Sequence, residues 1–302
     1  MKKALITRRV AILAAASLSF LAACGGSSND SSKASDTTVA ASPGNGKKIL
    51  SLSPTATEML YAIGAGDQVV AVDSLSNYPT EAADKVTKIS AFEPNAEAIL
   101  GYSPDIVLIS NDMNKITEQL KTAKPDITVW TGAMANTIDD VYAQITDLGK
   151  VTGHDTEAAA LIAKMKTDLA AATEGVTAPE GASYYYELDN TYYSLTSNTF
   201  VGSLLKSTGI ANIADGVEVG NDWPQLNAES IIKANPSVVF LADTKCCQQN
   251  AAAVAKRAGW ADLDAVKNSR VVELDDDIAS RWGPRIVDLV KQMVEAIAAL
   301  QK

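Results

Sequence analysis

The chain has 302 residues, a formal net charge of −10 at pH 7 and one histidine, His154. Its length is sufficient for two hydrophobic cores, and its acidic balance leaves no basic face that could neutralise nucleic-acid phosphates. A single histidine argues against an imidazole-based zinc or manganese site and against a Ser-His-Asp triad. No GxSxG, HExxH or phosphate-binding glycine loop is present. We therefore expect no nucleic-acid partner, no resident metal, no cofactor and no enzymatic activity.

Residues 1–23 have the pattern of a targeting segment. Four basic residues precede an apolar run from Val10 to Ala23 that is too short for a comfortable membrane span. The run ends in Leu-Ala-Ala-Cys, which resembles a bacterial lipobox, where cleavage before the cysteine is followed by lipidation of that cysteine. We expect Cys24 to be a lipid anchor; the alternative is an ordinary secretory signal with a chance cysteine. Residues 24–47, rich in Gly, Ser, Asp and Thr, predict a flexible tether.

The segment 48–152 alternates between strand-like and helical patterns. Strands are predicted at 48–53, 68–73, 105–110 and 127–132, and helices at 55–66, around Glu97 and at 114–123. Apolar strands that alternate with amphipathic helices indicate a parallel sheet covered on both faces. This segment is the expected N-terminal lobe.

A long helix is predicted between the two halves of the chain. Residues 154–176 are rich in helix formers and contain no Gly or Pro before Gly175. We expect residues 153–180 to form a stiff connector that lets the lobes move little, with His154 on the surface at its start.

The segment 181–302 repeats the alternation. Strands are predicted at 183–188, 192–197, 237–243 and 270–275, and helices at 200–208, 228–234, 250–258 and 284–300. The predicted fold class is therefore α/β, with two Rossmann-like lobes, each built on a central sheet, joined by one long helix and separated by a ligand cleft.

A sixteen-residue stretch occurs twice in the sequence. Residues 95–110 and 227–242 align without gaps, and both predict a short helix, a turn containing proline and a buried strand. Glu97 and Glu229 occupy the same place in the two copies. Two matched carboxylates, one on each lobe, suit a partner with two-fold symmetry.

Several large side chains are candidates for ligand contact. Tyr78 follows the predicted strand 68–73, and ligands in open α/β sheets bind beyond the carboxyl ends of the strands. Phe92 precedes the first repeat and Trp223 precedes the second. Arg281 and Trp282 stand at the start of the last predicted helix. Each aromatic side chain could instead pack within its own lobe. Arg285 could be solvated or salt-bridged, and the acidic run 275–277 predicts helix capping rather than a calcium loop.

Cys246 and Cys247 are adjacent in the sequence. They could form a strained vicinal disulfide, remain reduced or bind a metal, although no second pair completes a tetrahedral zinc site. We expect a local structural disulfide in a loop.

Four segments together resemble one family, the extracytoplasmic substrate-binding proteins with a helical backbone that serve ABC importers of vitamin B12, ferric siderophores and haem. These segments are LSPTATEMLYAIGAGDQVVAVDSLSNYP, NAEAILGYSPDIVL, WPQLNAESIIKANPSVVF and RWGPRIVDL, and the likeness spans residues 48–302. It is greatest to the vitamin B12 binders, which share the Tyr-Pro at Tyr78 and the Trp-Pro-Gln at Trp223. The chain departs from them by having Phe92 where a tryptophan stands and no tryptophan after residues 106–110.

The resemblance implies roles for particular residues. It assigns ligand contact to Tyr78 and Trp223. The family also has an arginine at the position of Arg281. In the family, the glutamates that match Glu97 and Glu229 form salt bridges with arginines of the permease dimer. The implied protein is a monomeric receptor, anchored to the cell membrane by lipidated Cys24, that delivers a corrinoid to a permease and its ATPase.

Other ligands and functions are open alternatives. A ferric siderophore is the second ligand, and haem is less favoured because the sole histidine is misplaced for axial ligation, although a tyrosine could serve as the ligand instead. A surface enzyme that uses Glu97 and Glu229 as an acid–base pair would need both carboxyls within about 10 Å of each other. A third alternative is an adhesin or scaffold.

Overall fold

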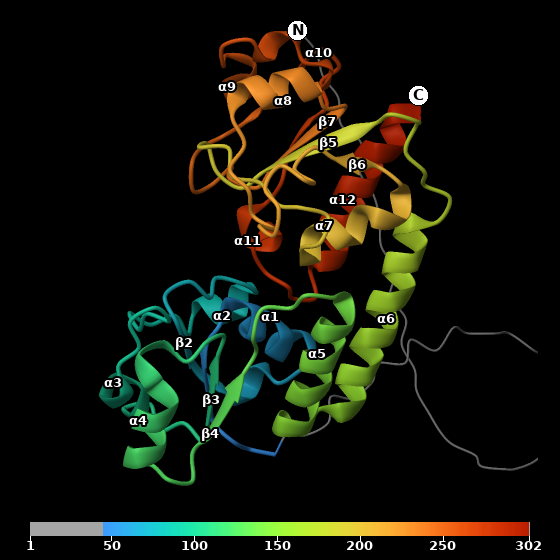
Figure 1. Ribbon diagram of the computed structural model, residues 1–302. Helices are drawn as coiled ribbons and strands as arrows, with labels where there is room; N and C mark the ends of the chain where they lie inside the picture. The colour runs from blue at the N-terminus through green and yellow to red at the C-terminus, as the bar shows by residue number, and fades with distance from the viewer. Residues whose placement is uncertain (1–44, 302) are drawn as a thin grey trace, which may run out of the picture. The chain divides into compact units, whose positions relative to one another are not determined.

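The computed structural model describes residues 45–301. The expected signal peptide, Cys24 and most of the tether lie outside these residues. The described part contains two four-stranded parallel sheets, one on each side of α6 (Asp155–Thr173) in the sequence (Figure 1). The two Rossmann-like lobes of the α/β prediction are thereby confirmed. Within residues 45–301, no helix is long and apolar enough to cross a membrane.

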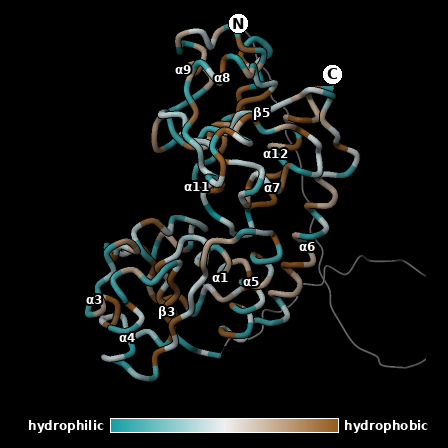
Figure 2. Tube along the Cα trace, in the orientation of Figure 1, coloured by the Kyte–Doolittle hydropathy of each residue, from teal (hydrophilic) through white to brown (hydrophobic). Residues whose placement is uncertain are grey.

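The N-terminal sheet has the order β2-β1-β3-β4. Its strands are β1 (Ile49–Leu52), β2 (Val69–Val72), β3 (Ile106–Ile109) and β4 (Thr128–Thr131). Every residue of β1 and β3 is buried, because helices cover both faces of the two central strands. The strand β3 is correspondingly apolar in Figure 2. The surrounding helices are α1 (Pro54–Ala62), η1 (Gly66–Gln68), α2 (Thr80–Ala83), α3 (Ala96–Leu100), η2 (Met113–Lys115), α4 (Ile116–Ala123) and α5 (Ile138–Thr152).

The helix α5 was not predicted, although its sequence carries clear signals. Thr137 and Asp140 form a capping box at its start, and Gly153 ends it in the left-handed region at φ 79°. The next helix approaches closely: a Cβ atom at Gly149 would lie 2.7 Å from that of Ala158 on α6. Glycine at this position therefore lets α5 and α6 pack as an antiparallel pair.

The C-terminal sheet has the order β6-β5-β7-β8. Its strands are β5 (Ser183–Glu187), β6 (Ala211–Asn212), β7 (Val238–Leu241) and β8 (Val271–Glu273). The helices are α7 (Phe200–Leu205), η3 (Lys206–Thr208), α8 (Ala228–Ala234), α9 (Ala251–Ala255), η4 (Trp260–Asp262), α10 (Asp264–Lys267), α11 (Asp276–Ala279), α12 (Ile286–Ala298) and η5 (Ala299–Gln301).

The predicted strand at 192–197 is wrong. Only Tyr193 forms a β-bridge there, to Gln225, and the fourth strand of the sheet is the two-residue β6 instead. The amide of Ser194 donates to the carbonyl of Pro224, but proline has no N–H to return the bond, which weakens the pairing of this segment.

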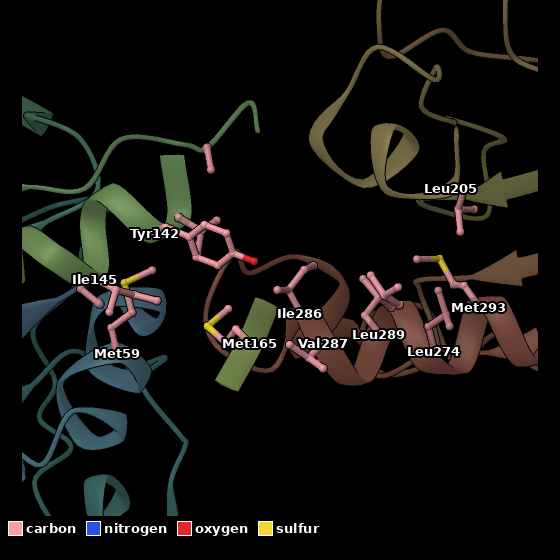
Figure 3. Packing of buried hydrophobic residues seen from close by; sticks show 14 of the residues in the cluster. Met59, Tyr142, Ile145, Met165, Leu205, Leu274, Ile286, Val287, Leu289 and Met293 are labelled. Atoms are coloured by element: carbon pink, nitrogen blue, oxygen red, sulfur yellow. The ribbon is translucent and has the colours of Figure 1, made fainter. Parts of the chain in front are cut away.

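One hydrophobic cluster joins the two lobes. It contains residues of the N-terminal lobe, of α6 and of α12, among them Met59, Tyr142, Ile145, Met165, Ile286, Val287 and Leu289 (Figure 3). Seven residues of α12 are buried, whereas α6 buries only Ala158 and Met165. The helix α6 connects the lobes along the chain, as predicted, and α12 shares the apolar cluster that packs them together.

His154 is buried, which corrects the expected surface position. It stands at the turn between α5 and α6, where only 2% of the residue is exposed. Its Nδ1 lies 3.8 Å from the carboxylate of Glu157, and the ring packs beside Gly64. The histidine therefore contributes to the packing of this turn.

A buried carboxyl pair lies at the carboxyl edge of the C-terminal sheet. Glu187 ends β5 and Asp243 follows β7, and these strands are neighbours. Arg257 donates to both oxygens of Glu187 at 2.6 Å and stacks over the ring of Trp260. Burial and the adjacent Glu187 carboxylate raise the pKa of Asp243 to about 7. The charge of Arg257 is balanced by Glu187, which leaves no cation for Asp243, so Asp243 retains its proton in mildly acidic solution.

We predict that Asp243→Asn stabilises the protein at pH 8 by about 3 kcal/mol relative to wild type, and much less at pH 4. Between the usual aspartate pKa and about 7, the native state binds a proton that the unfolded state has lost, so wild-type stability falls as pH rises. Asparagine mimics the protonated form and removes this slope. Urea denaturation across pH 4–8 measures it; equal pH slopes in both proteins would contradict the assignment.

Candidate functional site: a groove between the lobes

Three cavities that share lining residues lie next to one another; the second and third are lined by both lobes, and the first by the N-terminal lobe alone. Their volumes are about 140, 360 and 220 Å³. Pro54, Leu75 and Ser110 line both the first and the second cavity. Arg281 and Trp282 line both the second and the third. We call this set of cavities the groove.

The groove follows the carboxyl ends of the strands. Pro54 comes after β1, Asp73 after β2 and Ser110 after β3, while Leu188 comes after β5. In open α/β sheets, ligands bind in the crevice beyond the carboxyl ends of the strands, where the loop side chains can contact them. Asp73 is buried at the base, and burial raises its pKa against the opposing effects of hydrogen bonds from Ser76 and the charge of Arg281.

The N-terminal side of the groove rests on a network of hydroxyl groups. Ser110 donates to Ser53 at 2.7 Å, and Ser53 caps α1 by accepting from the amide of Ala56. Thr57 connects Ser51 and Ser76, at 2.9 and 3.0 Å. These neutral partners satisfy one another, so the floor of this lobe is rigid and uncharged around Asp73.

Exposed apolar side chains stand along the groove. Phe92 is 62% exposed and Trp223 is 45% exposed, and they line the cavities at its two ends. Leu75 and Met134 are similarly exposed. The indole of Trp282 is held in place by a 3.0 Å hydrogen bond from Nε1 to Gln144. Large apolar groups that are left exposed around a concave surface favour a bulky, partly apolar ligand.

A buried carboxylate holds the lobes together behind the groove. Glu58 of α1 accepts from Arg285 at 2.8 and 2.5 Å and from Arg281 at 2.9 Å. Arg281 also donates to Asn77, to the carbonyl of Leu75 and to Asp277. We call Glu58, Asn77, Asp277, Arg281 and Arg285 the clasp.

The clasp limits what Arg281 offers a ligand. Its two terminal nitrogens make four hydrogen bonds within the protein. The residue lines the groove, but most of its guanidinium is already engaged. Burial opposes the ionisation of Asp277, but hydrogen bonds from Lys245 and Asn77 and the charge of Arg281 hold its pKa below the usual value.

Tyr78 lies outside the groove, unlike the other predicted aromatic contacts. It lines a separate cavity of about 810 Å³, and its ring lies 4.0 Å from the guanidinium of Arg285. Leu75, three residues earlier, takes the position on the groove instead. Sequence reasoning missed Leu75 and Met134; the position of Leu75, two residues after the end of the predicted strand, was the available signal for the first.

Glu97 and Glu229 are exposed and occupy equivalent positions. Each lies in the first turn of its helix, α3 or α8, where the N-cap asparagine, Asn95 or Asn227, accepts from a main-chain amide. Neither glutamate lines the groove. In Figure 1, α3 and α8 belong to different lobes, and each lies away from α6.

Cys246 and Cys247 are free thiols, so the expected disulfide is not present in the structure. Their Sγ atoms lie 2.7 Å apart in the loop that follows β7. Among residues 45–301, no group of three or more His, Cys, Asp or Glu side chains is arranged to hold a metal ion.

The chain matches the family model described as periplasmic binding protein over residues 49–278. It is 34% identical over 275 residues to an uncharacterized ABC transporter substrate-binding lipoprotein, YvrC, of Bacillus subtilis, covering 89% of this chain and 84% of that protein. It is 30% identical over 258 residues to the cobalamin-binding protein of Halobacterium salinarum, covering 83% of this chain and 69% of the relative.

Solved structures share the fold. The periplasmic vitamin B12 binding protein BtuF of Vibrio cholerae superimposes with a TM-score of 0.67 at 27% identity, covering 86% of this chain and 99% of BtuF. A possible iron-binding (periplasmic solute-binding) protein of Staphylococcus epidermidis superimposes with a TM-score of 0.70 at 26% identity, covering 83% of this chain and 98% of the other.

We predict that Glu58→Gln lowers the free energy of unfolding by about 3–5 kcal/mol, because it leaves two buried guanidinium groups without their shared counter-charge. Urea denaturation measures the loss. Glu118→Gln, at an exposed glutamate of α4, is the control and should change stability by less than about 0.5 kcal/mol. Equal, small effects of the two substitutions would show that the clasp does not stabilise the fold.

Proposed function

Because the chain belongs to the periplasmic binding protein family, whose members bind small molecules for ABC importers, we propose that it captures a corrinoid in the groove and delivers it to a permease. The observation that carries this proposal is the groove of adjoining cavities, with an exposed aromatic side chain from each lobe at its ends, Phe92 and Trp223. The similarity to a cobalamin-binding protein over 258 residues supports the same ligand class.

The side chains around the groove suit a corrinoid. A corrinoid presents a broad apolar macrocycle rimmed by amide groups. Phe92, Trp223 and Met134 offer apolar area for the macrocycle, and Ser110 and Asn136 offer polar groups for the amides. The clasp and the interlobe core hold both walls before binding, which limits the entropy lost when a ligand is bound.

Haem and a ferric siderophore are the competing ligands. Haem is disfavoured because His154 is buried at the turn before α6, and Tyr78 lies outside the groove. A siderophore is the second candidate, supported by the similarity to the iron-binding protein of Staphylococcus epidermidis.

The proposal extends to location and partner. Cys24 would be lipidated, so the tether 24–47 would hold a monomeric receptor at the outer face of the cell membrane. Glu97 and Glu229 would meet arginines of a two-fold symmetric permease, one glutamate from each lobe, and its ATPase would drive import. Their exposure in the first turns of α3 and α8 supports this docking role.

We predict that the purified chain binds cyanocobalamin in isothermal titration calorimetry and that Trp223→Ala weakens binding about tenfold or more, since removing a central aromatic contact typically costs over 1 kcal/mol. Tyr102→Ala, at an exposed aromatic residue outside the groove, should leave affinity unchanged. Binding of a ferric siderophore without any binding of cyanocobalamin at micromolar concentration would move the assignment to the second candidate.

We predict that Glu97→Lys and Glu229→Lys each abolish most ligand uptake into proteoliposomes that contain the permease, while ligand affinity in calorimetry stays at the wild-type value. The reason is that reversed charge at either contact repels the arginines of the partner. Glu118→Lys is the exposed control on α4 and should transport normally. Loss of ligand affinity in either variant would contradict the docking role.

A further inference from the structure

The adjacent cysteines lie on the surface of the C-terminal lobe. Cys246 is exposed and Cys247 is half-buried, and their Sγ atoms are 2.7 Å apart. They are the only cysteines among residues 45–301. Two accessible thiols at this separation can be joined by one oxidation step without a large movement of other side chains.

The loop that carries the thiols is tied to α11. Asp276 accepts from the amides of Lys245 and Cys246, at 3.0 and 2.8 Å, and from the hydroxyl of Thr244. The ammonium group of Lys245 lies 2.8 Å from Asp275 and 2.7 Å from Asp277. The backbone and the side chain next to Cys246 therefore both depend on the first residues of α11.

These contacts lead directly to the clasp. Asp277, which pairs with Lys245, also accepts from Arg281 at 2.9 Å and from Asn77 at 3.1 Å. Arg281 in turn lines the groove and pairs with Glu58. Only Lys245 and Asp277 lie between the thiol pair and the arginine of the clasp.

A bond between neighbouring cysteines must alter the loop. Cα atoms across a trans peptide are about 3.8 Å apart, whereas unstrained disulfides join Cα atoms about 4.4–6.8 Å apart. Closing the ring therefore rotates the peptide between Cys246 and Cys247, whose N–H donates to the carbonyl of Asp243. The rotation also moves the Cα atom of Cys246, whose own N–H donates to Asp276. Burial and the neighbouring Cys247 raise the pKa of the Cys246 thiol to about 12, so this thiol stays protonated until an oxidant engages its partner.

We propose that Cys246 and Cys247 form a two-electron redox site whose oxidation weakens the clasp through Lys245 and Asp277. The oxidant is a disulfide of a protein or small molecule. One cysteine thiolate attacks it and releases a thiol, then the second cysteine attacks the mixed disulfide and releases the other. The products are one vicinal disulfide and two reduced thiols, and both cysteine protons pass to the solvent or the leaving thiolates.

The consequence for binding rests on the proposed function. In the oxidised form the Lys245–Asp277 pair loosens, Arg281 is held less firmly, and the walls of the groove are less well ordered before a ligand arrives. Ligand affinity is therefore lower in the oxidised form than in the reduced form. Lipidation outside the cytoplasm would place the site where disulfide oxidants are present.

The redox site is tested first without any ligand. The purified chain carrying Cys24→Ser, in which Cys246 and Cys247 are the only thiols, is equilibrated in mixtures of reduced and oxidised glutathione, alkylated with N-ethylmaleimide and weighed intact. We expect one transition from a doubly alkylated form to a form lacking two hydrogens, and only glutathione adducts in Cys246→Ser and Cys247→Ser. Glutathione adducts or unreacted thiols in the wild type at every ratio would overturn the proposal.

The link to the clasp is tested by hydrogen exchange and calorimetry on both forms. Peptides that cover 275–285 should exchange faster in the oxidised form, and cyanocobalamin should bind about fivefold more weakly, the lower end of coupling between linked sites. Lys245→Met should retain the redox transition but lose both differences. Identical exchange in the two forms would overturn the link. Absence of ligand binding in both forms, with the exchange difference intact, would count against the proposed function alone.

Discussion

The arrangement of the two lobes depends on one buried carboxylate. Glu58 comes from the first helix of the N-terminal lobe, and Arg281 and Arg285 both precede the first residue of α12. Buried charges are costly unless each is paired and hydrogen-bonded. The second arginine would leave a positive excess, but Asp277 supplies the matching negative charge. The clasp is thus electrically balanced, and two of its members bracket Trp282 on the wall of the groove.

The clasp works together with the apolar core that α12 shares with α6. The helix α12 buries seven residues, several of them in the cluster that also holds Met59 and Ile145 of the N-terminal lobe. Polar contacts thereby fix the lobes on one side of α12 while apolar contacts fix them along its length. Under the proposed function, a ligand would meet walls that are already in place, so little binding energy would be spent on ordering them.

Sequence reasoning succeeded where local pattern determines structure. Central parallel strands such as β3 and β7 are short, continuous apolar runs, and the repeat correctly placed α8 over Ala228–Ala234. It could not find contacts between distant positions. The ring of Tyr78 lies against the guanidinium of Arg285, more than two hundred residues later. Glu58 and Arg281, which form an ion pair, are 223 positions apart in the sequence, and hydrophobic periodicity cannot predict a contact at that separation.

The duplicated segment shows which features are determined by local sequence alone. In both lobes it produces the same asparagine cap, the same exposed glutamate and the same buried strand. The surroundings of the two sheets nevertheless diverge at their carboxyl ends. The N-terminal edge ends in hydroxyl groups that bond one another around Asp73, whereas the C-terminal edge carries Glu187, Asp243 and Arg257.

That divergence assigns different tasks to the lobes. The hydroxyl network around the N-terminal edge of the groove consists of neutral side chains that bond one another, Ser51, Ser53, Thr57, Ser76 and Ser110. The C-terminal edge holds a carboxyl with a pKa of about 7 and two thiols on the adjoining loop. Since the loop that carries the thiols contacts α11 through Asp276, and Asp277 of α11 belongs to the clasp, the C-terminal lobe is the one in which the proposed redox site adjoins the groove.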